Sequence, residues 1–213
     1  KGFYTLAEQH GICLVGGDTV KSPVRSLAVT IMGSAPPDRM LTRSVAQPGD
    51  LIAVTGALGD AGLGLRSIQH PESMPASLNP EDIDFLQMRL NRPTPRVEEG
   101  RRLAEVAHAA IDISDGLLQD LMHILRASHV GAVVETDRLP ISPAARAWIA
   151  ADPSQHHLPL TAGDDYELLF TIAPDQWATL DVPTTVIGRI TEDKRLRVLD
   201  AQGHDMPVHV QGF

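Results

Sequence analysis

The stretch Ile111-Asp112-Ile113-Ser114-Asp115-Gly116-Leu117 contains a predicted strand, a turn and the start of a predicted helix. Residues 111–113 have the apolar character of a short buried strand, and Asp115-Gly116 is typical of a turn. After the turn, apolar residues recur at helical spacing, so that one predicted helix face carries Leu117, Leu118, Leu121, Ile124 and Leu125. A strand that passes through an acidic turn into an amphipathic helix is typical of α/β and α+β proteins.

The same alternation continues on both sides of this stretch. Strands are predicted at residues 51–55, 130–134, 167–172, 185–190 and 196–199, and helices at residues 81–92, 96–108, 143–150 and 174–180. A glycine-rich turn at residues 56–64 opens a further helix. We therefore predict an α/β (α+β) domain over residues 38–213.

Residues 1–37 precede this domain and have a different pattern. Residues 3–10 are predicted to be the end of a helix that stops at Gly11, and residues 12–15 and 27–31 are predicted strands. The run Ala35-Pro36-Pro37-Asp38 breaks the pattern, so we place a domain boundary there. Because the chain starts with Lys1 and enters a helical pattern directly, we expect that an N-terminal part is missing.

The composition excludes several classes of protein. The chain has 18 Lys+Arg and 27 Asp+Glu, a net charge of −9, and lacks the basic surface that nucleic acid requires. Its single cysteine excludes an internal disulfide framework, and no apolar run approaches the roughly 20 residues of a membrane helix. With no signal peptide at its start, we expect a cytoplasmic protein that binds neither nucleic acid nor membrane.

Three acidic clusters follow or precede predicted strands: residues 17–19, 112–116 and 163–167. Ligands of α/β sheets usually bind at strand ends. Carboxylates gathered there repel phosphates but are good ligands for Mg²⁺, which also coordinates phosphate oxygens. Asp112 and Ser114 would share one strand face, and Asp115 at the turn could bend back to the same point.

Each cluster also has a purely structural interpretation. Ser114 or Asp115 can cap the following helix, and Asp18 can form an Asx turn after two glycines. For Asp164-Asp165 the structural interpretation is weaker, because one of two adjacent carboxylates must lie near the sheet edge and needs a partner or a ligand.

Two further segments could contact phosphate. The guanidinium of Arg43 has the planar shape that suits phosphate oxygens, although a surface ion pair is the better explanation when this residue is taken alone. The run of residues 56–64 resembles a phosphate-binding loop, but it lacks the Lys-Ser/Thr of a Walker A motif. We interpret its glycines mainly as sites of close packing between helix and sheet.

Taken in order, six motifs resemble the thiamine-monophosphate kinase family, within the superfamily of aminoimidazole ribonucleotide synthetase. They are Gly16-Gly17-Asp18-Thr19, Leu41-Thr42-Arg43-Ser44 with Pro48-Gly49-Asp50, Val54-Thr55-Gly56, Arg92-Pro93-Thr94-Pro95-Arg96, Ile111 to Leu117 and Gly163-Asp164-Asp165-Tyr166-Glu167-Leu168. The resemblance implies a synthetase-like C-terminal domain with a mixed sheet flanked by helices over residues 38–213. Residues 1–37 would be the tail of an N-terminal ATP-binding and dimerisation domain.

The resemblance also implies an activity: ATP-dependent phosphorylation of thiamine monophosphate to thiamine diphosphate, by direct transfer, in a homodimer with several Mg²⁺ ions. By position in the motifs, Asp18, Asp112 and Asp115 would hold Mg²⁺, with Asp112 and Asp115 at the catalytic centre. Residues that would contact ATP are Gly17, Asp18, Arg43 and Ser114. Asp164 stands where the family usually has Glu and would meet the thiamine phosphate, and Phe213 would pack on the substrate.

This sequence departs from the family pattern, and other interpretations stay open. The family's N-terminal metal motifs and its Asp-His-Phe ending are absent. The alternatives are another ATP-using enzyme of the same superfamily, a non-catalytic nucleotide- or metal-binding module, and a folded fragment with no function of its own.

Overall fold

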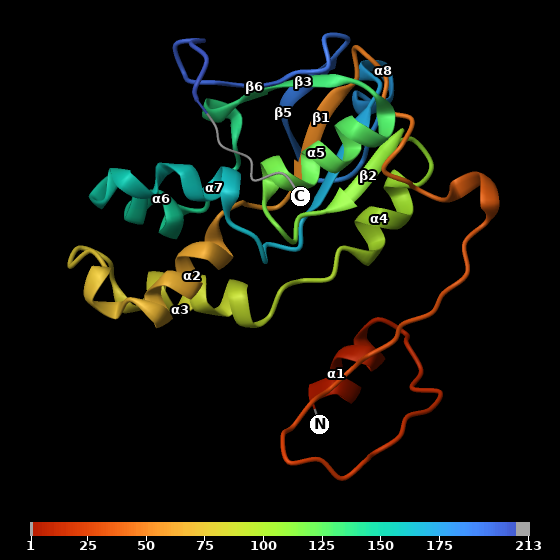
Figure 1. Cartoon of the computed structure of the whole chain (residues 1–213), viewed down its shortest axis with the longest axis vertical. Helices are drawn as coiled ribbons and strands as arrows, with labels where there is room; N and C mark the ends of the chain where they lie inside the picture. The colour runs from red at the N-terminus through yellow and green to blue at the C-terminus, as the bar shows by residue number, and fades with distance from the viewer. Residues whose placement is uncertain (1, 208–213) are drawn as a thin grey trace. The chain divides into compact units, whose positions relative to one another are not determined.

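The computed structural model describes residues 2–207, and the chain divides into two compact units, Lys1–Asp38 and Arg39–Phe213 (Figure 1). The second unit holds all six strands of the described residues and most of their helices. In the described part of the chain, none of the helices has both the length and the apolar character that crossing a membrane requires.

The first unit contains the predicted helix but not the predicted strands. Helix α1 spans Gly2–Gln9, and Gly11 follows it in the left-handed conformation with φ +63°. Residues 12–15 and 27–31, predicted as strands, are without regular structure, and Leu27 is 90% exposed. The apolar alternation is present, but a strand also needs a neighbouring strand for its hydrogen bonds, which residues 12–36 do not provide for one another.

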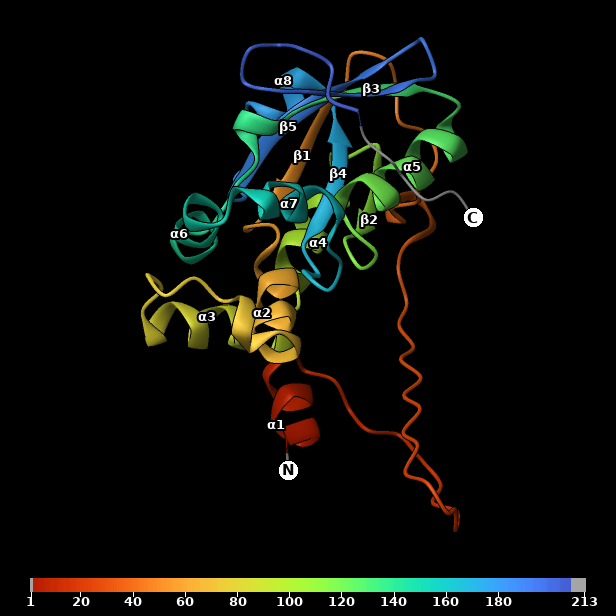
Figure 2. The same cartoon turned by 60° about the vertical axis from the view of Figure 1, so that its left-hand side comes forward.

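The second unit is built on one six-stranded mixed sheet, which confirms the predicted fold class. The strand order is β2-β4-β1-β5-β3-β6, and every neighbouring pair is antiparallel except the parallel pair β3 and β6. Figure 2 shows β1 between β5 and β4. The strands are β1 (Leu51–Thr55), β2 (Ala109–Asp112), β3 (Gly131–Glu135), β4 (Leu168–Ile172), β5 (Thr184–Thr191) and β6 (Leu196–Leu199).

Helices lie on both faces of the sheet because its strands alternate their side chains. In β1, Ile52 and Val54 pack into the larger core with helix α5 (Leu117–Ser128), which crosses the front of the sheet in Figure 1. Ala53 points the other way and packs with Leu103 of helix α4 (Val97–Leu103). The period of two along β1 is the expected result for a strand that is buried on both faces.

A third core joins helices beside the sheet. Helices α2 (Asp60–Gln69), α3 (Pro80–Asn91) and α6 (Pro143–Ala151) meet around Leu63, Leu86 and the fully buried Trp148. Gly64 allows the two helices of the α2–α3 pair to approach closely, since an added Cβ would overlap the carbonyl oxygen of Leu86. The shorter helices are η1 (Pro37–Arg39), η2 (Pro71–Ser73), η3 (Thr136–Arg138), η4 (Pro153–His157), α7 (Leu158–Thr161) and α8 (Pro174–Trp177).

Two predicted helices are shorter than expected. The helix predicted at residues 96–108 ends at Leu103, and the one predicted at residues 174–180 is a single turn. The first must end early because the chain enters β2 at Ala109, and the backbone N–H of His108 already donates to Thr171 of β4. Local helical spacing alone does not reveal where such a sheet contact begins.

Candidate active site

Two acidic loops meet at one end of the sheet, where β1 and β2 end and β4 begins. The first loop, residues 112–116, follows β2, and the second, residues 163–167, precedes β4. Three backbone hydrogen bonds join them: Asp164 N–H to Ser114 O at 3.0 Å, Tyr166 N–H to Ile113 O at 2.9 Å and Ile113 N–H to Glu167 O at 2.8 Å. An added Cβ at Gly163 would overlap the carbonyl oxygen of Ser114, so the close approach of the loops requires glycine there.

The backbone of the first loop is held by Asp120 on α5. Its Oδ2 accepts the backbone N–H groups of Ser114, Asp115 and Gly116 at 3.0, 3.0 and 3.1 Å. Burial raises the pKa of Asp120, and these three N–H groups oppose that shift because they stabilise the carboxylate. With its backbone held in this way, the loop presents the side chains of Asp112 and Asp115 to solvent.

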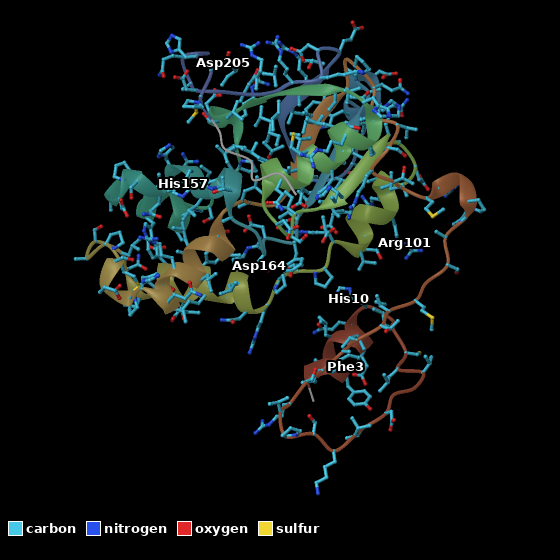
Figure 3. The ribbon with its side chains drawn as sticks, viewed as in Figure 1. Phe3, His10, Arg101, His157, Asp164 and Asp205 are labelled. Atoms are coloured by element: carbon cyan, nitrogen blue, oxygen red, sulfur yellow. The ribbon has the colours of Figure 1, made fainter. Side chains whose placement is uncertain are left out.

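The second loop points its side chains alternately outward and inward. Asp165 and Glu167 are 3% and 1% exposed, whereas Tyr166 is 41% exposed and Asp164, labelled in Figure 3, is half-buried. Asp164 and Tyr166 both have positive φ angles, +65° and +51°, which are rare for residues with a Cβ. The Tyr166 hydroxyl donates to Oδ1 of Asp164 at 3.2 Å.

The outward side chains of the two loops gather at one place. Burial of its ring raises the pKa of Tyr166, and the hydrogen bond to Asp164 and the charges of Asp164, Asp112 and Asp115 raise it further. The backbone hydrogen bonds between the two loops place these three carboxylates and the phenol at the same end of the sheet. Three carboxylates and an aromatic ring at a strand end can hold a cation and the ligand that the cation bridges.

On the inward side, Glu167 is held by two arginines and a threonine. Arg96 donates Nε to Oε2 at 2.6 Å and Nη2 to Oε1 at 2.7 Å, and Arg89 donates Nη2 to Oε1 at 2.8 Å. Thr55, the last residue of β1, donates Oγ1 to Oε2 at 2.6 Å. Burial alone would raise the pKa of Glu167, but the hydrogen bonds from Arg96 and Thr55 outweigh it and lower the pKa.

Asp165 occupies the N-terminus of α2. Its carboxylate accepts the backbone N–H of Gly59 at 2.7 Å and that of Ala61 at 3.2 Å. Burial raises the pKa of Asp165 to about 7 against these stabilising bonds. The N–H groups that a bound phosphate would need are therefore already used by a carboxylate of the same chain.

This arrangement explains the glycine-rich run 56–64. An added Cβ would overlap Glu167 at Gly56 and Leu86 at Gly64, and at Gly59, whose φ is +85°, it would lie in tight contact with Pro159. The glycines serve close packing, as predicted, but their partners are a buried carboxylate and neighbouring helices rather than the sheet.

The structure brings together four of the predicted site residues: Asp112, Ser114, Asp115 and Asp164. Arg43 is positioned by backbone contacts: the carbonyl of the preceding Thr42 accepts the N–H of Ala110 in β2 at 3.0 Å, and its own carbonyl accepts from Ser128 at the end of α5 at 3.3 Å.

The other predicted residues belong to the first unit or lie outside the described part. Gly17 and Asp18 are exposed in the first unit, where Asp18 Oδ1 accepts the backbone N–H of Thr19 at 2.7 Å. Phe213 lies outside the described residues.

Sequence reasoning missed the residues that support the loops, among them Arg89, Asp120 and His123. Ligand atoms of Asp115, Asp120 and His123 lie within 4.8 Å of one another, a grouping that could hold a metal ion. Asp120 and His123 are three residues apart on α5, so both face the acidic turn. An Asp and a His three residues apart, directly after the acidic turn, are the sequence pattern that could have indicated this grouping.

Comparisons with known proteins identify the family of this chain. The family described as AIR synthase related protein, C-terminal domain, matches residues 47–201. Thiamine-monophosphate kinase of Escherichia coli O157:H7 is 39% identical over 197 residues, covering 89% of this chain and 59% of that protein. The resemblance inferred from the ordered motifs is therefore confirmed.

Solved structures give the same result. The crystal structure of thiamine-monophosphate kinase from Stenotrophomonas maltophilia K279a is 42% identical with a TM-score of 0.78, covering 92% of this chain and 64% of that one. AaThiL complexed with AMPPCP and TMP is 29% identical with a TM-score of 0.67, covering 78% and 52%. The chain thus spans between half and two thirds of the length of these relatives.

Proposed function

The chain belongs to the family of AIR synthase related proteins through its C-terminal domain, and we propose that it is part of a thiamine-monophosphate kinase. The proposed reaction transfers the γ-phosphoryl group of ATP directly to the phosphate of thiamine monophosphate, giving thiamine diphosphate and ADP. The relative complexed with AMPPCP, an analogue of ATP, and TMP supports both ligands.

One observation carries the proposal: the two acidic loops converge. Hydrogen bonds between residues 113–114 and 164–167 bring the carboxylates of Asp112 and Asp115 to the same place as that of Asp164. In the proposed roles, Asp112 and Asp115 act on the ATP side and Asp164 on the acceptor side. Phosphoryl transfer depends mainly on positioning and charge neutralisation, and this convergence would position both reactants.

The donor set fits Mg²⁺. Among the described residues, Asp112 and Asp115 have exposed carboxylates without a side-chain hydrogen bond or ion pair, and carboxylate oxygens are the ligands that Mg²⁺ prefers. Asp112 and Asp115 would hold the ion here, with Asp18 as a further proposed ligand. When bound, Mg²⁺ supplies the positive charge that an acidic site otherwise lacks for phosphate.

The remaining assignments are part of the same proposal. Gly17, Asp18, Arg43 and Ser114 would contact ATP, and Phe213 would pack on the acceptor. Arg43 needs its own test because its contacts in the structure are made by its backbone carbonyl, which accepts from Ser128 of α5. Its replacement by alanine should raise the KM for ATP if the assignment holds.

We also propose the setting of the enzyme. Residues 1–37 would belong to an N-terminal ATP-binding and dimerisation domain, residues 38–213 would be the synthetase-like domain, and the protein would act as a cytoplasmic homodimer. The exposed apolar residues of the first unit, such as Leu27 and Ile31, support a partner surface there.

The test is a product assay on the full-length gene product. The protein is mixed with ATP, Mg²⁺ and thiamine monophosphate, and thiamine diphosphate is measured by chromatography. Omitting Mg²⁺ and replacing thiamine monophosphate with thiamine are the controls. We expect thiamine diphosphate and ADP in equal amounts, and only in the complete mixture.

Two outcomes would contradict the proposal. ADP release without thiamine diphosphate would indicate an enzyme of the superfamily with another acceptor. ATP binding without any turnover would indicate a non-catalytic nucleotide-binding protein.

A further inference from the structure

Tyr166 has a conformation that the fold must enforce. Its φ of +51° follows the +65° of Asp164 two residues earlier, and non-glycine residues seldom adopt such angles. Their backbone N–H groups are bound by Ile113 and Ser114, and the side chains of Asp165 and Glu167 anchor the positions between and after them. Strain that is held in place from several sides is characteristic of functional loops.

The ring of Tyr166 is exposed in this conformation. Tyr166 is 41% exposed, whereas the neighbouring acids Asp165 and Glu167 are almost fully buried. A tyrosine that served only to fill the core would turn its ring inward, as the fully buried Phe170 of β4 does. The ring of Tyr166 is therefore available to a ligand.

The surroundings of the ring are strongly negative. Its hydroxyl donates to Asp164 Oδ1, and the charges of Asp112, Asp115 and Asp164 all act on the phenol and favour its neutral, hydrogen-donating form. An aromatic face carries partial negative charge and attracts cations. A flat ring with a positive charge suits such a place, whereas a phosphate without a metal ion does not.

The proposed acceptor contains such a ring, because the thiazolium of thiamine monophosphate carries a permanent positive charge. We propose that Tyr166 is a specificity-determining residue that packs its ring against the cationic ring of the acceptor while its hydroxyl holds the carboxylate of Asp164. This inference rests on the proposed function and assigns to Tyr166 a contact with the acceptor rather than with ATP.

The experiment compares three substitutions in the full-length gene product. Tyr166→Leu removes the aromatic face, Tyr166→Phe removes only the hydroxyl, and Trp177→Leu is the control at another exposed aromatic, on α8. For each variant, calorimetry measures the Kd of thiamine monophosphate and, separately, that of a non-hydrolysable ATP analogue, and a kinetic assay measures both KM values.

We expect Tyr166→Leu to weaken binding of thiamine monophosphate about tenfold, as the loss of a cation–π contact would. Binding of the ATP analogue should change less than about twofold, and Tyr166→Phe should weaken acceptor binding less than about threefold. Trp177→Leu should leave both ligands unaffected.

The wild-type protein separates failure of this inference from failure of the proposed function. If it converts thiamine monophosphate but Tyr166→Leu binds that acceptor normally, the role of Tyr166 is wrong and the function stands. Equal losses for acceptor and ATP analogue, or equal losses in the Leu and Phe variants, also overturn the ring contact. If the wild type does not act on thiamine monophosphate, the proposed function fails and this inference fails with it.

Discussion

The outward and inward carboxylates of the acidic loops are the same chemical group, but they differ in exposure and in their hydrogen-bond partners. Asp112 and Asp115 are exposed and, among the described residues, have no side-chain hydrogen bond or ion pair. Asp165 and Glu167, one peptide plane away from Asp164 and Tyr166, are buried and accept six hydrogen bonds between them. In this site, burial with complete partners marks a carboxylate that holds the structure, and exposure without partners marks one that can hold a ligand.

The largest expected effect tests the outward set. Asp115→Asn removes a negative charge that is proposed to hold Mg²⁺. It should therefore lower turnover by about two orders of magnitude or more, while the melting temperature stays nearly unchanged. Steady-state kinetics at saturating Mg²⁺ and a thermal melt measure the two quantities. Asp175→Asn on α8 is the matched control, an exposed aspartate outside the loops. Near-normal turnover of Asp115→Asn would contradict the proposal that Asp115 holds Mg²⁺.

Glu167→Gln tests the inward set. It leaves the guanidinium groups of Arg89 and Arg96 buried beside a neutral amide, so we expect the free energy of unfolding to fall by about 3–5 kcal/mol. Glu99→Gln is the control, because Glu99 pairs with the same Arg96 but its side chain is 27% exposed. Its loss should cost less than about 1 kcal/mol in a denaturant titration. Similar losses in both variants would mean that burial does not distinguish these pairs.

The stability of the protein should depend on pH through the buried carboxyl of Asp165. The pKa of Asp165 is raised from 3.8 to about 7 in the folded protein, so the folded state binds its proton more tightly than the unfolded state. The contribution of Asp165 to stability is thus fully present below about pH 4 and is lost as the pH rises through about 7. Asp165→Asn should flatten the decrease in unfolding free energy over this pH range, measured by denaturant titration. An unchanged slope would show that other groups cause it.

The smallest effect is expected for an exposed ion pair. Arg39 and Glu105 lie 2.8 Å apart with side chains 56% and 58% exposed. A double-mutant cycle with alanine at both positions should give a coupling of about 0.5 kcal/mol, which decreases as salt is added. A coupling as large as the loss expected for Glu167→Gln would show that burial is not the reason why the inward carboxylates contribute more to stability.

Much of the second unit could be predicted from the sequence, because its strands are apolar and its helices have clear spacing. Strand β1 has the bounds that its apolar run predicts, and the Asp115-Gly116 pair correctly indicates the acidic turn before α5. The strands predicted in residues 12–31 failed because pairing is a property of two segments, and one segment cannot reveal its partner.

The site was predictable only in part, for a related reason. Asp112, Asp115 and Asp164 stand out in the sequence as acids at strand ends, but nothing local distinguishes Asp164 from Asp165. The difference arises from Gly59 and Ala61, about a hundred residues earlier, whose N–H groups receive Asp165 alone. In the same way, Arg89 and Arg96 become site residues only through their distant partner Glu167.

The strand order has a consequence for the way the site is assembled. β4 lies between β1 and β2, and Glu167 at its start is 112 residues from Thr55 and 78 from Arg89. β1 and β2 are synthesised first and have no shared edge until β4 enters between them. Loop closure over such distances makes this insertion a slow, late event. The two acidic loops, residues 112–116 and 163–167, can therefore form the hydrogen bonds that join them only after β4 has entered the sheet.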